Sequence, residues 1–345
     1  MNMAKHGLRI ADCGAPDGAA CVASLRHARP DRLGSPSGQR GAAVLMALFV
    51  ATLATLIVSG LFWGQFVLLR TIENQQLVTQ SRLLLRGALD WSRAILREDQ
   101  RTTAQDTLSE PWAQGLAETR LDQLGETSAL ASLASIAGSI EDAQARYNLR
   151  NLFAEDGKPK EAEVRTLERL CESAGLSADV ASRLVEGLRL AWSPVAVEGI
   201  NDLPLAPLRL TELSWVGIDS ASIAKLAPFV IVLPAPTPVN ANTASREVLV
   251  AVLDGLDLGT AERLLELRQR SPFGNLEEIR AQIGQAIKLE DARVSVGSSF
   301  FEVVGRMRLD QFVIEELSLV ERRSGDRGAE VVALHRERRP VMATP

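Results

Sequence analysis

The chain has 345 residues, of which 23% are charged, and its formal net charge is −5. This acidic balance argues against a sequence-independent nucleic-acid binder, because such proteins normally carry a basic surface. His335 is the only histidine beyond residue 41, which excludes a cluster of histidine metal ligands there. The sequence also contains no Gly-x-Ser-x-Gly, phosphate-loop or dinucleotide-binding motif, so we predict a protein that is not an enzyme.

The segment from Gly41 to Trp63 contains no charged residue, and the next charge is Arg70. About 20 apolar helical residues are enough to cross the hydrocarbon core of a bilayer. Basic residues precede the segment and are opposed nearby only by Asp31: Arg26, Arg29, Arg32 and Arg40. Positive residues beside a first span keep that end in the cytoplasm. We therefore predict a transmembrane helix over residues 42–63, with everything after about residue 64 outside. Gly41 directly follows a basic residue, which suggests processing at the start of the span.

The helix is expected to continue through residues 64–98 as an amphipathic segment. One face carries apolar residues at steps of 7, 4, 3 and 4: Leu77, Leu84, Ala88, Trp91 and Ile95. The opposite side is charged: Arg82, Arg86, Asp90, Arg93 and Arg97. Because such a stripe is usually packed against a globular domain, we predict that these five apolar residues form a core and partner-helix stripe.

The remaining pattern predicts an α+β fold. Residues 139–152 alternate loosely like a strand, residues 153–290 hold several helical segments, and residues 291–345 read as antiparallel strands. We interpret this order as an all-helical domain, 153–290, inserted into a sheet domain formed by residues 99–152 and 291–345. Cys171 lies in an apolar-patterned helical segment and is expected to be a small buried side chain.

Several segments carry a resemblance to a known family: RGAAVLMALFVATLATLIVSG, DWSRAILRED, IEDAQARYNLRNL, VNANTASREVLVAVL, and the C-terminal SSFFEVVGRMRL and LVERR. In this order and spacing they resemble the general secretion pathway protein K (GspK) family, the large minor pseudopilins of type II secretion systems. The resemblance covers most of the chain after residue 40. It implies a pilin-like antiparallel sheet domain interrupted by a helical domain of SAM-like or helix-hairpin-helix-like type.

The resemblance also implies processing and a place in a filament. A prepilin peptidase would remove the cytoplasmic leader 1–41 by cutting between Gly41 and Ala42, and Ala42 would then be N-methylated. Ordinary pilins carry Glu at the fifth mature position, where this chain has Met46. A carboxylate inside hydrocarbon is costly unless another group neutralises it, and in a pilus that group is thought to be the amine of a neighbouring subunit. A subunit that lacks this carboxylate needs no neutralising amine from a neighbour, which fits a position at the end of the filament.

The implied function is that of a minor pseudopilin at the tip of the periplasmic pseudopilus. There it would help initiate assembly for the export of folded proteins across the outer membrane. The chain would cross the bacterial inner membrane once, with its C-terminal domain in the periplasm. Implied partners are the other minor pseudopilins and the prepilin peptidase, with secreted cargo and the outer-membrane secretin as further candidates, and no nucleic acid.

Some family members bind calcium, which prefers six or more oxygen ligands, usually several from carboxylates. The loop after Trp192, residues 193–207, offers only Glu198 and Asp202. We therefore predict neither a metal site nor a cofactor.

Two alternatives stay open. Residues 239–279 also resemble the helix-hairpin-helix of DNA-binding proteins, but the turn reads Gly255-Leu256-Asp257 with Gly259 in place of a typical basic residue. Asp257 would repel a phosphate, so we favour a structural helical module. The other alternative is an uncleaved single-pass membrane protein unrelated to secretion.

Overall fold

The computed structural model describes residues 39–125, 132, 134–192, 203–284, 287–309, 312–325 and 328–342. The chain divides into two compact units, Met1–Thr71 and Ile72–Pro345. Helix α1, Gln39–Thr102, begins in the first unit and ends in the second. The helix therefore continues a few residues beyond the predicted end at residue 98.

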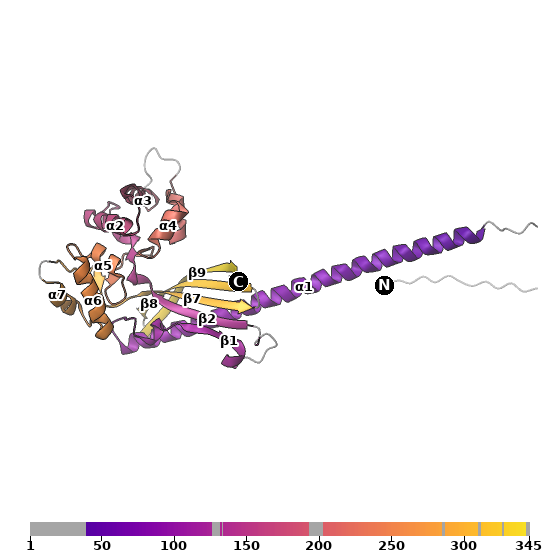
Figure 1. Cartoon of the computed structure of the whole chain (residues 1–345), viewed down its shortest axis with the longest axis horizontal. Helices are drawn as coiled ribbons and strands as arrows, with labels where there is room; N and C mark the ends of the chain where they lie inside the picture. The colour runs from indigo at the N-terminus through magenta and orange to yellow at the C-terminus, as the bar shows by residue number, and fades with distance from the viewer. Residues whose placement is uncertain are drawn as a thin grey trace, which may run out of the picture. The chain divides into compact units, whose positions relative to one another are not determined.

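The second unit contains the end of α1, the helices α2–α7 and an antiparallel sheet of five strands in the order β1-β2-β7-β8-β9 (Figure 1). Its strands are β1 Leu116–Arg120, β2 Ala134–Asp142, β7 Phe300–Leu309, β8 Phe312–Gly325 and β9 Gly328–Met342. Strands β2 and β7 are direct neighbours, with Asp142 opposite Phe301, although the helices α2–α7 lie between them in the chain. Strands β8 and β9 are antiparallel neighbours, and their pairing extends to Gly325 opposite Gly328.

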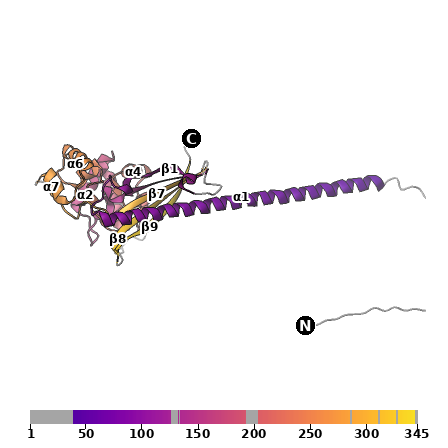
Figure 2. The same ribbon diagram turned by 90° about the horizontal axis from the view of Figure 1, so that it is seen from below.

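The helices between β2 and β7 gather at one end of the sheet, as both views of the ribbon show (Figures 1 and 2). They are α2 Glu161–Ser173, α3 Ala178–Ala191, α4 Ser220–Leu226, α5 Arg246–Val252, α6 Leu258–Arg270 and α7 Leu276–Ile283. Four of them begin at a polar residue whose side chain accepts from a backbone N–H three residues on: Asp219, Ser245, Asp257 and Asn275. Such caps satisfy one of the free N–H groups at a helix start, which explains where these helices begin.

Short elements join the helical region to the sheet. Two parallel pairs of two-residue strands are present: β3 Tyr147–Asn148 with β4 Val230–Ile231, and β5 Val239–Asn240 with β6 Val294–Ser295. The 3₁₀ turns are η1 Pro111–Ala113, η2 Leu121–Leu124, η3 Ala143–Ala145, η4 Leu149–Leu152 and η5 Leu210–Val216.

The predicted α+β class, with a long N-terminal helix and an antiparallel sheet, is confirmed. The helical region has its own apolar core, which includes Leu167, Leu184 and Leu213, each fully buried. Cys171 lies in the same core, as predicted, and burial raises the pKa of its thiol to about 11. The thiol is therefore protonated at neutral pH and is not a ready nucleophile.

Candidate functional site

The first part of α1 is an apolar helix, and among the described residues of its own unit nothing is packed against it. Every residue from Gly41 to Thr71 is exposed, and this part of α1 contains a window of mean hydropathy 2.5. Among the described residues, α1 is the one helix long and apolar enough to cross a membrane. The Thr52 and Thr55 hydroxyls donate to the carbonyl oxygens of Phe49 and Ala51. These donors therefore need no water, which suits a segment surrounded by hydrocarbon.

The three positions singled out near the start of α1 are all helical and exposed. Gly41 and Ala42 are exposed on the first turns of α1, and Met46 is 68% exposed. A Cβ added at Gly41 would meet no atom within 4 Å, so the fold itself does not require glycine there. Residues 1–38 lie outside the described residues. The cut between Gly41 and Ala42 and the methylation of Ala42 stay predictions.

The face of α1 that packs on the sheet differs from the predicted one. Its buried residues are Ser81, Leu85, Leu89, Ser92, Leu96 and Asp99. This line has the predicted spacing but lies about one residue, or 100°, around the helix from the predicted stripe. Leu77, Leu84, Ala88 and Ile95 are only half-buried along its edge, and Trp91 is 59% exposed. Trp91 was therefore wrongly predicted as a core residue.

Two serines explain why the wrong face of α1 was predicted to be buried. Ser81 and Ser92 interrupt the apolar pattern of the true line, so the sequence favoured its neighbour. In the structure their hydroxyls donate to the carbonyl oxygens four residues earlier, those of Leu77 and Ala88. A serine satisfied within its own helix can be buried without an unpaired polar group, and the larger Leu side chains beside it then fill the interface.

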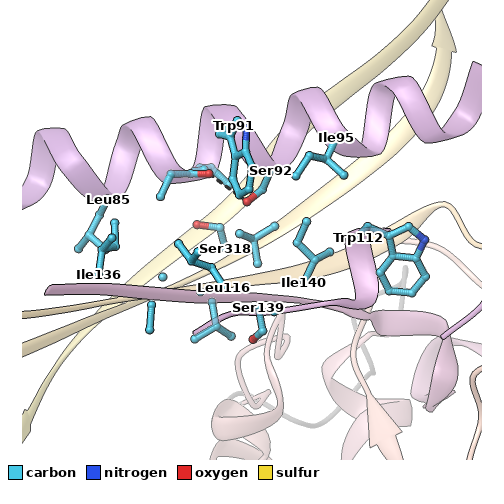
Figure 3. Close-up of a pocket in the computed structure, with 18 of the residues that line it drawn as sticks. Leu85, Trp91, Ser92, Ile95, Trp112, Leu116, Ile136, Ser139, Ile140 and Ser318 are labelled. Carbon is cyan, nitrogen blue, oxygen red and sulfur yellow. Dashed lines mark hydrogen bonds between the residues drawn. The ribbon is translucent and has the colours of Figure 1, made fainter. Parts of the chain in front are cut away.

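A small cavity of about 70 Å³ remains between α1 and the sheet (Figure 3). Its walls are mostly apolar, with Leu85 on α1 above Ile136 on β2, and Trp112 closing one end. Gly305 leaves room for the helix here, since a Cβ at this position would come within 3.1 Å of Leu85 Cδ2. A space of this size and lining is a packing gap under the helix rather than a pocket for a substrate.

The outer face of α1, turned away from the centre of its buried line, carries exposed apolar and small side chains. We define this outer face by Leu83, Gly87, Trp91 and Ala94, all of which are exposed. Leu83 is 64% exposed, and a Cβ added at Gly87 would meet no atom within 4 Å. A glycine beside large apolar side chains lets a second helix approach closely. The outer face is thus suited to packing against another helix.

A buried ionic network joins the end of α1 to the sheet. Arg322 on β8 donates from Nη1 to Asp99 Oδ2 at 2.7 Å and from Nη2 to Asp106 Oδ1 at 2.6 Å. Its guanidinium also donates to the carbonyl oxygen of Ser298 at 2.8 Å. The side chains of Arg322, Asp99 and Asp106 are at most 8% exposed. The network therefore connects α1, the loop after it and β8 inside the protein.

A third buried carboxylate extends this network to the helical region. Asp142 Oδ2, at the end of β2, accepts from Asn240 Nδ2 at 2.9 Å, Thr243 Oγ1 at 2.6 Å and Ser298 Oγ at 2.7 Å. Asn240 Nδ2 also lies 3.1 Å from the carbonyl oxygen of Asp106. Ser298 and Asn240 thus connect Asp142 with Asp106, so the sheet and the start of α5 share one set of hydrogen bonds.

The carboxyls Asp99, Asp106 and Glu110 lie together and resemble a cation site, with oxygens within 4.8 Å of one another. Arg322 already supplies the positive charge to the two aspartates. Glu110 Oε2 accepts from the Thr107 N–H and from Trp112 Nε1. The arrangement fits a guanidinium better than a metal ion. The loop residues Glu198 and Asp202, considered for calcium, lie outside the described residues.

The network predicts that stability rises as the pH falls from 8 to 6. Burial raises the pKa of Asp106 from 3.8 to about 7, even with Arg322 beside it, and burial also raises the pKa values of Asp99 and Asp142. A group whose pKa is raised by folding stabilises the fold fully below its unfolded pKa, and this contribution is lost as the pH rises through its folded pKa. We expect a gain of about 1 kcal/mol in the free energy of unfolding between pH 8 and 6.

Urea unfolding of the detergent-solubilised chain at several pH values measures this gain. Carboxyls whose pKa is lowered by ion pairing, such as Asp254 beside Arg169, lose their contribution only at more acidic pH. Asp106→Asn should reduce the change in the free energy of unfolding between pH 8 and 6. Asp90→Asn should leave that change as in wild type, because Asp90 is an exposed carboxylate paired with Arg93. Equal slopes for wild type and Asp106→Asn would contradict the assignment.

The turn between α5 and α6 is the one that resembles a DNA-binding hairpin. Gly255 has a φ of +88°, and Asp257 caps α6 by accepting from the Thr260 N–H at 2.9 Å and from Thr260 Oγ1 at 2.7 Å. These bonds lower the pKa of Asp257. A phosphate approaching the turn would meet an ionised carboxylate, which supports the structural interpretation of the hairpin.

His335 lies on β9 beside the guanidinium of Arg209. It is the histidine that a Ser-His-Asp triad in this part of the chain would need. Its Nε2 is 3.1 Å from Arg209 Nη1, so this nitrogen accepts from the guanidinium. Arg209 also forms an ion pair with Glu212. A second, longer ion pair joins Arg209 to Glu337, with an N–O distance of 3.4 Å. The contacts connect η5 with the edge of the sheet, which is a structural role.

Comparison with known proteins gives consistent results. A family described as "Type II secretion system (T2SS), protein K" matches residues 239–297, and a second family of the same description matches residues 145–235. The type II secretion system protein K of Pseudomonas aeruginosa is 28% identical over 295 residues, which cover 79% of this chain and 85% of that protein. The crystal structure of the GspK-GspI-GspJ complex from the enterotoxigenic Escherichia coli type 2 secretion system is similar in fold. Its matching chain has a TM-score of 0.57 and 20% identity, and the similarity covers 77% of this chain and 98% of that chain.

Proposed function

Because this chain belongs to the protein K family, the minor pseudopilins of type II secretion systems, we propose that it acts at the tip of the periplasmic pseudopilus. There it helps initiate assembly for the export of folded proteins across the outer membrane. The observation that carries this proposal is the division of α1. Residues 41–71 are apolar and exposed, whereas Leu85, Leu89 and Leu96 of the same helix are buried against the sheet.

In this proposal, residues 42–63 cross the inner membrane and the second unit works in the periplasm. The basic residues before Gly41 keep the leader in the cytoplasm, where the prepilin peptidase cuts between Gly41 and Ala42 and Ala42 is N-methylated. The role is structural rather than catalytic. Cys171 is buried with a raised pKa, and His335 is bound to Arg209.

Two features favour the tip over the shaft of the filament. Met46 stands where shaft subunits carry a glutamate, so no amine of a neighbouring subunit is required to neutralise a charge in the membrane. The second unit, Ile72–Pro345, is also large, and its helical region adds bulk to the sheet domain. A subunit of this size is difficult to repeat side by side along a filament but is accommodated at its end.

The proposed partners are other minor pseudopilins of the type represented in the GspK-GspI-GspJ complex, and the proposed contact is the outer face of α1. Leu83 and Trp91 would pack against the apolar N-terminal helix of a partner, with Gly87 allowing close approach. Secreted cargo and the outer-membrane secretin are further candidates for contact with the second unit.

Cysteine crosslinking in co-expressing cells tests this assembly. Leu83→Cys should form disulfide-linked products with cysteines placed in the helices of the other minor pseudopilins. Arg82→Cys is the matched control, because residue 82 is also exposed but lies about 100° around the helix. We expect at least a fivefold higher yield for Leu83→Cys. Equal yields from both positions would contradict the proposed face.

A further inference from the structure

The helical region contains a second, larger cavity that the proposed function does not use. Its volume is about 600 Å³. The hairpin between η4 and α2, the end of α3 and the Pro-rich segment after β4 surround it. Its lining residues include Arg150, Phe153, Lys160, Trp192, Pro234 and Pro236.

Trp192 forms a fixed wall of this cavity. Its indole Nε1 donates to the carbonyl oxygen of Pro207 at 3.2 Å. The ring of Phe153 meets it edge-on, with the ring centroids 5.9 Å apart at 88°. Both contacts hold the indole in one orientation, so the cavity has a preformed aromatic wall rather than a loose side chain.

Arg150 packs against this wall and, among the described residues, has no anionic partner. Its guanidinium carbon is 3.9 Å from the centroid of the Trp192 ring. The side chain is half-buried, and among the described residues its buried Nε has no hydrogen-bond partner. Several other partly buried arginines have acceptors: Arg146, Arg293 and Arg322 pair with carboxylates, and Arg268 donates to the carbonyl oxygens of Ala241 and Ala244. Burial of a guanidinium without an acceptor is unfavourable, which favours a ligand that supplies one.

The other charges around the cavity indicate how many negative charges the ligand carries. Arg189 is already paired through two hydrogen bonds with Glu186, at 2.7 and 2.8 Å. Lys160 adds an exposed positive charge, and Glu155 adds an exposed negative one. The unpaired charge of the cavity is thus about one, located at Arg150. This balance fits a single carboxylate and disfavours a phosphate-rich or other polyanionic ligand.

We propose that this cavity binds an extended peptide segment through one of its carboxylates. The carboxylate forms a paired hydrogen bond with the guanidinium of Arg150, in the geometry that arginine favours for carboxylates. The peptide chain lies on the flat rings of Phe153, Trp192, Pro234 and Pro236, as extended peptides do in grooves lined by aromatic residues. This assignment rests on the cavity alone and stands whether or not the chain works in secretion.

Fluorescence anisotropy of the full-length chain in detergent tests the proposal. The probe is a capped, fluorescein-labelled peptide of sequence Pro-Ala-Glu-Pro-Ala, compared with the same peptide carrying Gln in place of Glu. We expect saturable binding of the Glu peptide, at least tenfold weaker binding of the Gln peptide, and little competition by inorganic phosphate. Equal binding of the two peptides, no saturable binding, or displacement by phosphate at similar concentration would overturn the proposal.

Variants of the chain locate the binding. Arg150→Gln should weaken binding of the Glu peptide at least tenfold, and Arg150→Lys should restore only part of it, because lysine lacks the planar fork. Arg183→Gln is the matched control, since Arg183 is an exposed arginine on α3 paired with Asp179, and it should bind like wild type. Arg150→Gln should unfold at the wild-type temperature or above, since it removes an unpaired charge. If Arg150→Gln fails to fold, Arg150→Lys provides the second test, and wild-type affinity in that variant would overturn the paired contact with the guanidinium.

Discussion

Replacing Arg322 by Met should lower the free energy of unfolding by about 3–5 kcal/mol, because it leaves Asp99 and Asp106 buried without a cation. Both aspartates are at most 7% exposed, and Arg322 is 8% exposed. Urea unfolding of the detergent-solubilised chain at pH 8 measures the loss. The matched control is Arg323→Met, one residue further along β8, where the side chain is 50% exposed and an exposed ion pair contributes at most about 1 kcal/mol.

The pH dependence of the Arg322→Met variant separates loss of charge pairing from loss of packing. Without the guanidinium, the pKa values of Asp99 and Asp106 should rise further, so the variant should recover part of its stability as the pH falls. The triple variant Asp99→Asn, Asp106→Asn, Arg322→Met should be more stable at pH 8 than Arg322→Met alone, because it buries no unpaired charge. A loss that is equal for Arg322→Met and Arg323→Met would show that the network does not stabilise the fold.

Replacing Gly41 by Val should leave the leader attached and abolish export. Among the described residues, no atom lies within 4 Å of a Cβ at this position, and valine in a helix costs less than about 1 kcal/mol. Any failure of processing would therefore arise from the peptidase, which must accommodate the residue before the cut. N-terminal sequencing of membrane-extracted protein should find Ala42 first in wild type and residues of the leader in Gly41→Val.

Gly60→Val is the matched control for this experiment. Gly60 lies in the same apolar helix, and a Cβ there also meets no atom within 4 Å, so this variant should be processed normally. If Gly41→Val begins at Ala42, the cleavage site is wrong. If wild-type protein from cells with an active peptidase retains its leader, the chain is an uncleaved membrane anchor and the secretion proposal fails with it.

The parts of the fold that depend on local pattern were predictable. The apolar run after Gly41, the helix starts at Asp219, Ser245 and Asp257, and the C-terminal strands all follow from residue spacing and capping side chains. The buried face of α1 was not, because Ser81 and Ser92 conceal an apolar line and their hydroxyls become compatible with burial only once they bond within the helix.

Ion pairs between residues far apart in the chain could not be predicted from the sequence, for a different reason. Arg322 and Asp106 are separated by 216 residues, and no spacing rule connects positions that meet only through the sheet. Arg150 presents the converse case. In the segment IEDAQARYNLRNL it looks like an ordinary surface charge. Only the structure shows that its guanidinium lies over the ring of Trp192 and that its Nε has no hydrogen-bond partner among the described residues.

The pairing of Asp142 with Phe301 has a consequence for how this chain varies. The two ends of the helical region leave the sheet from directly opposed positions on neighbouring strands, whose Cα atoms are about 5 Å apart in any antiparallel pair. A loop of almost any length could therefore join these two strands. The free energy of closing a loop grows slowly with its length. Related chains are thus free to enlarge, shorten or reshape the segments between these points that do not bond to the sheet as Asn240, Thr243 and Arg209 do, while the five strands keep their register.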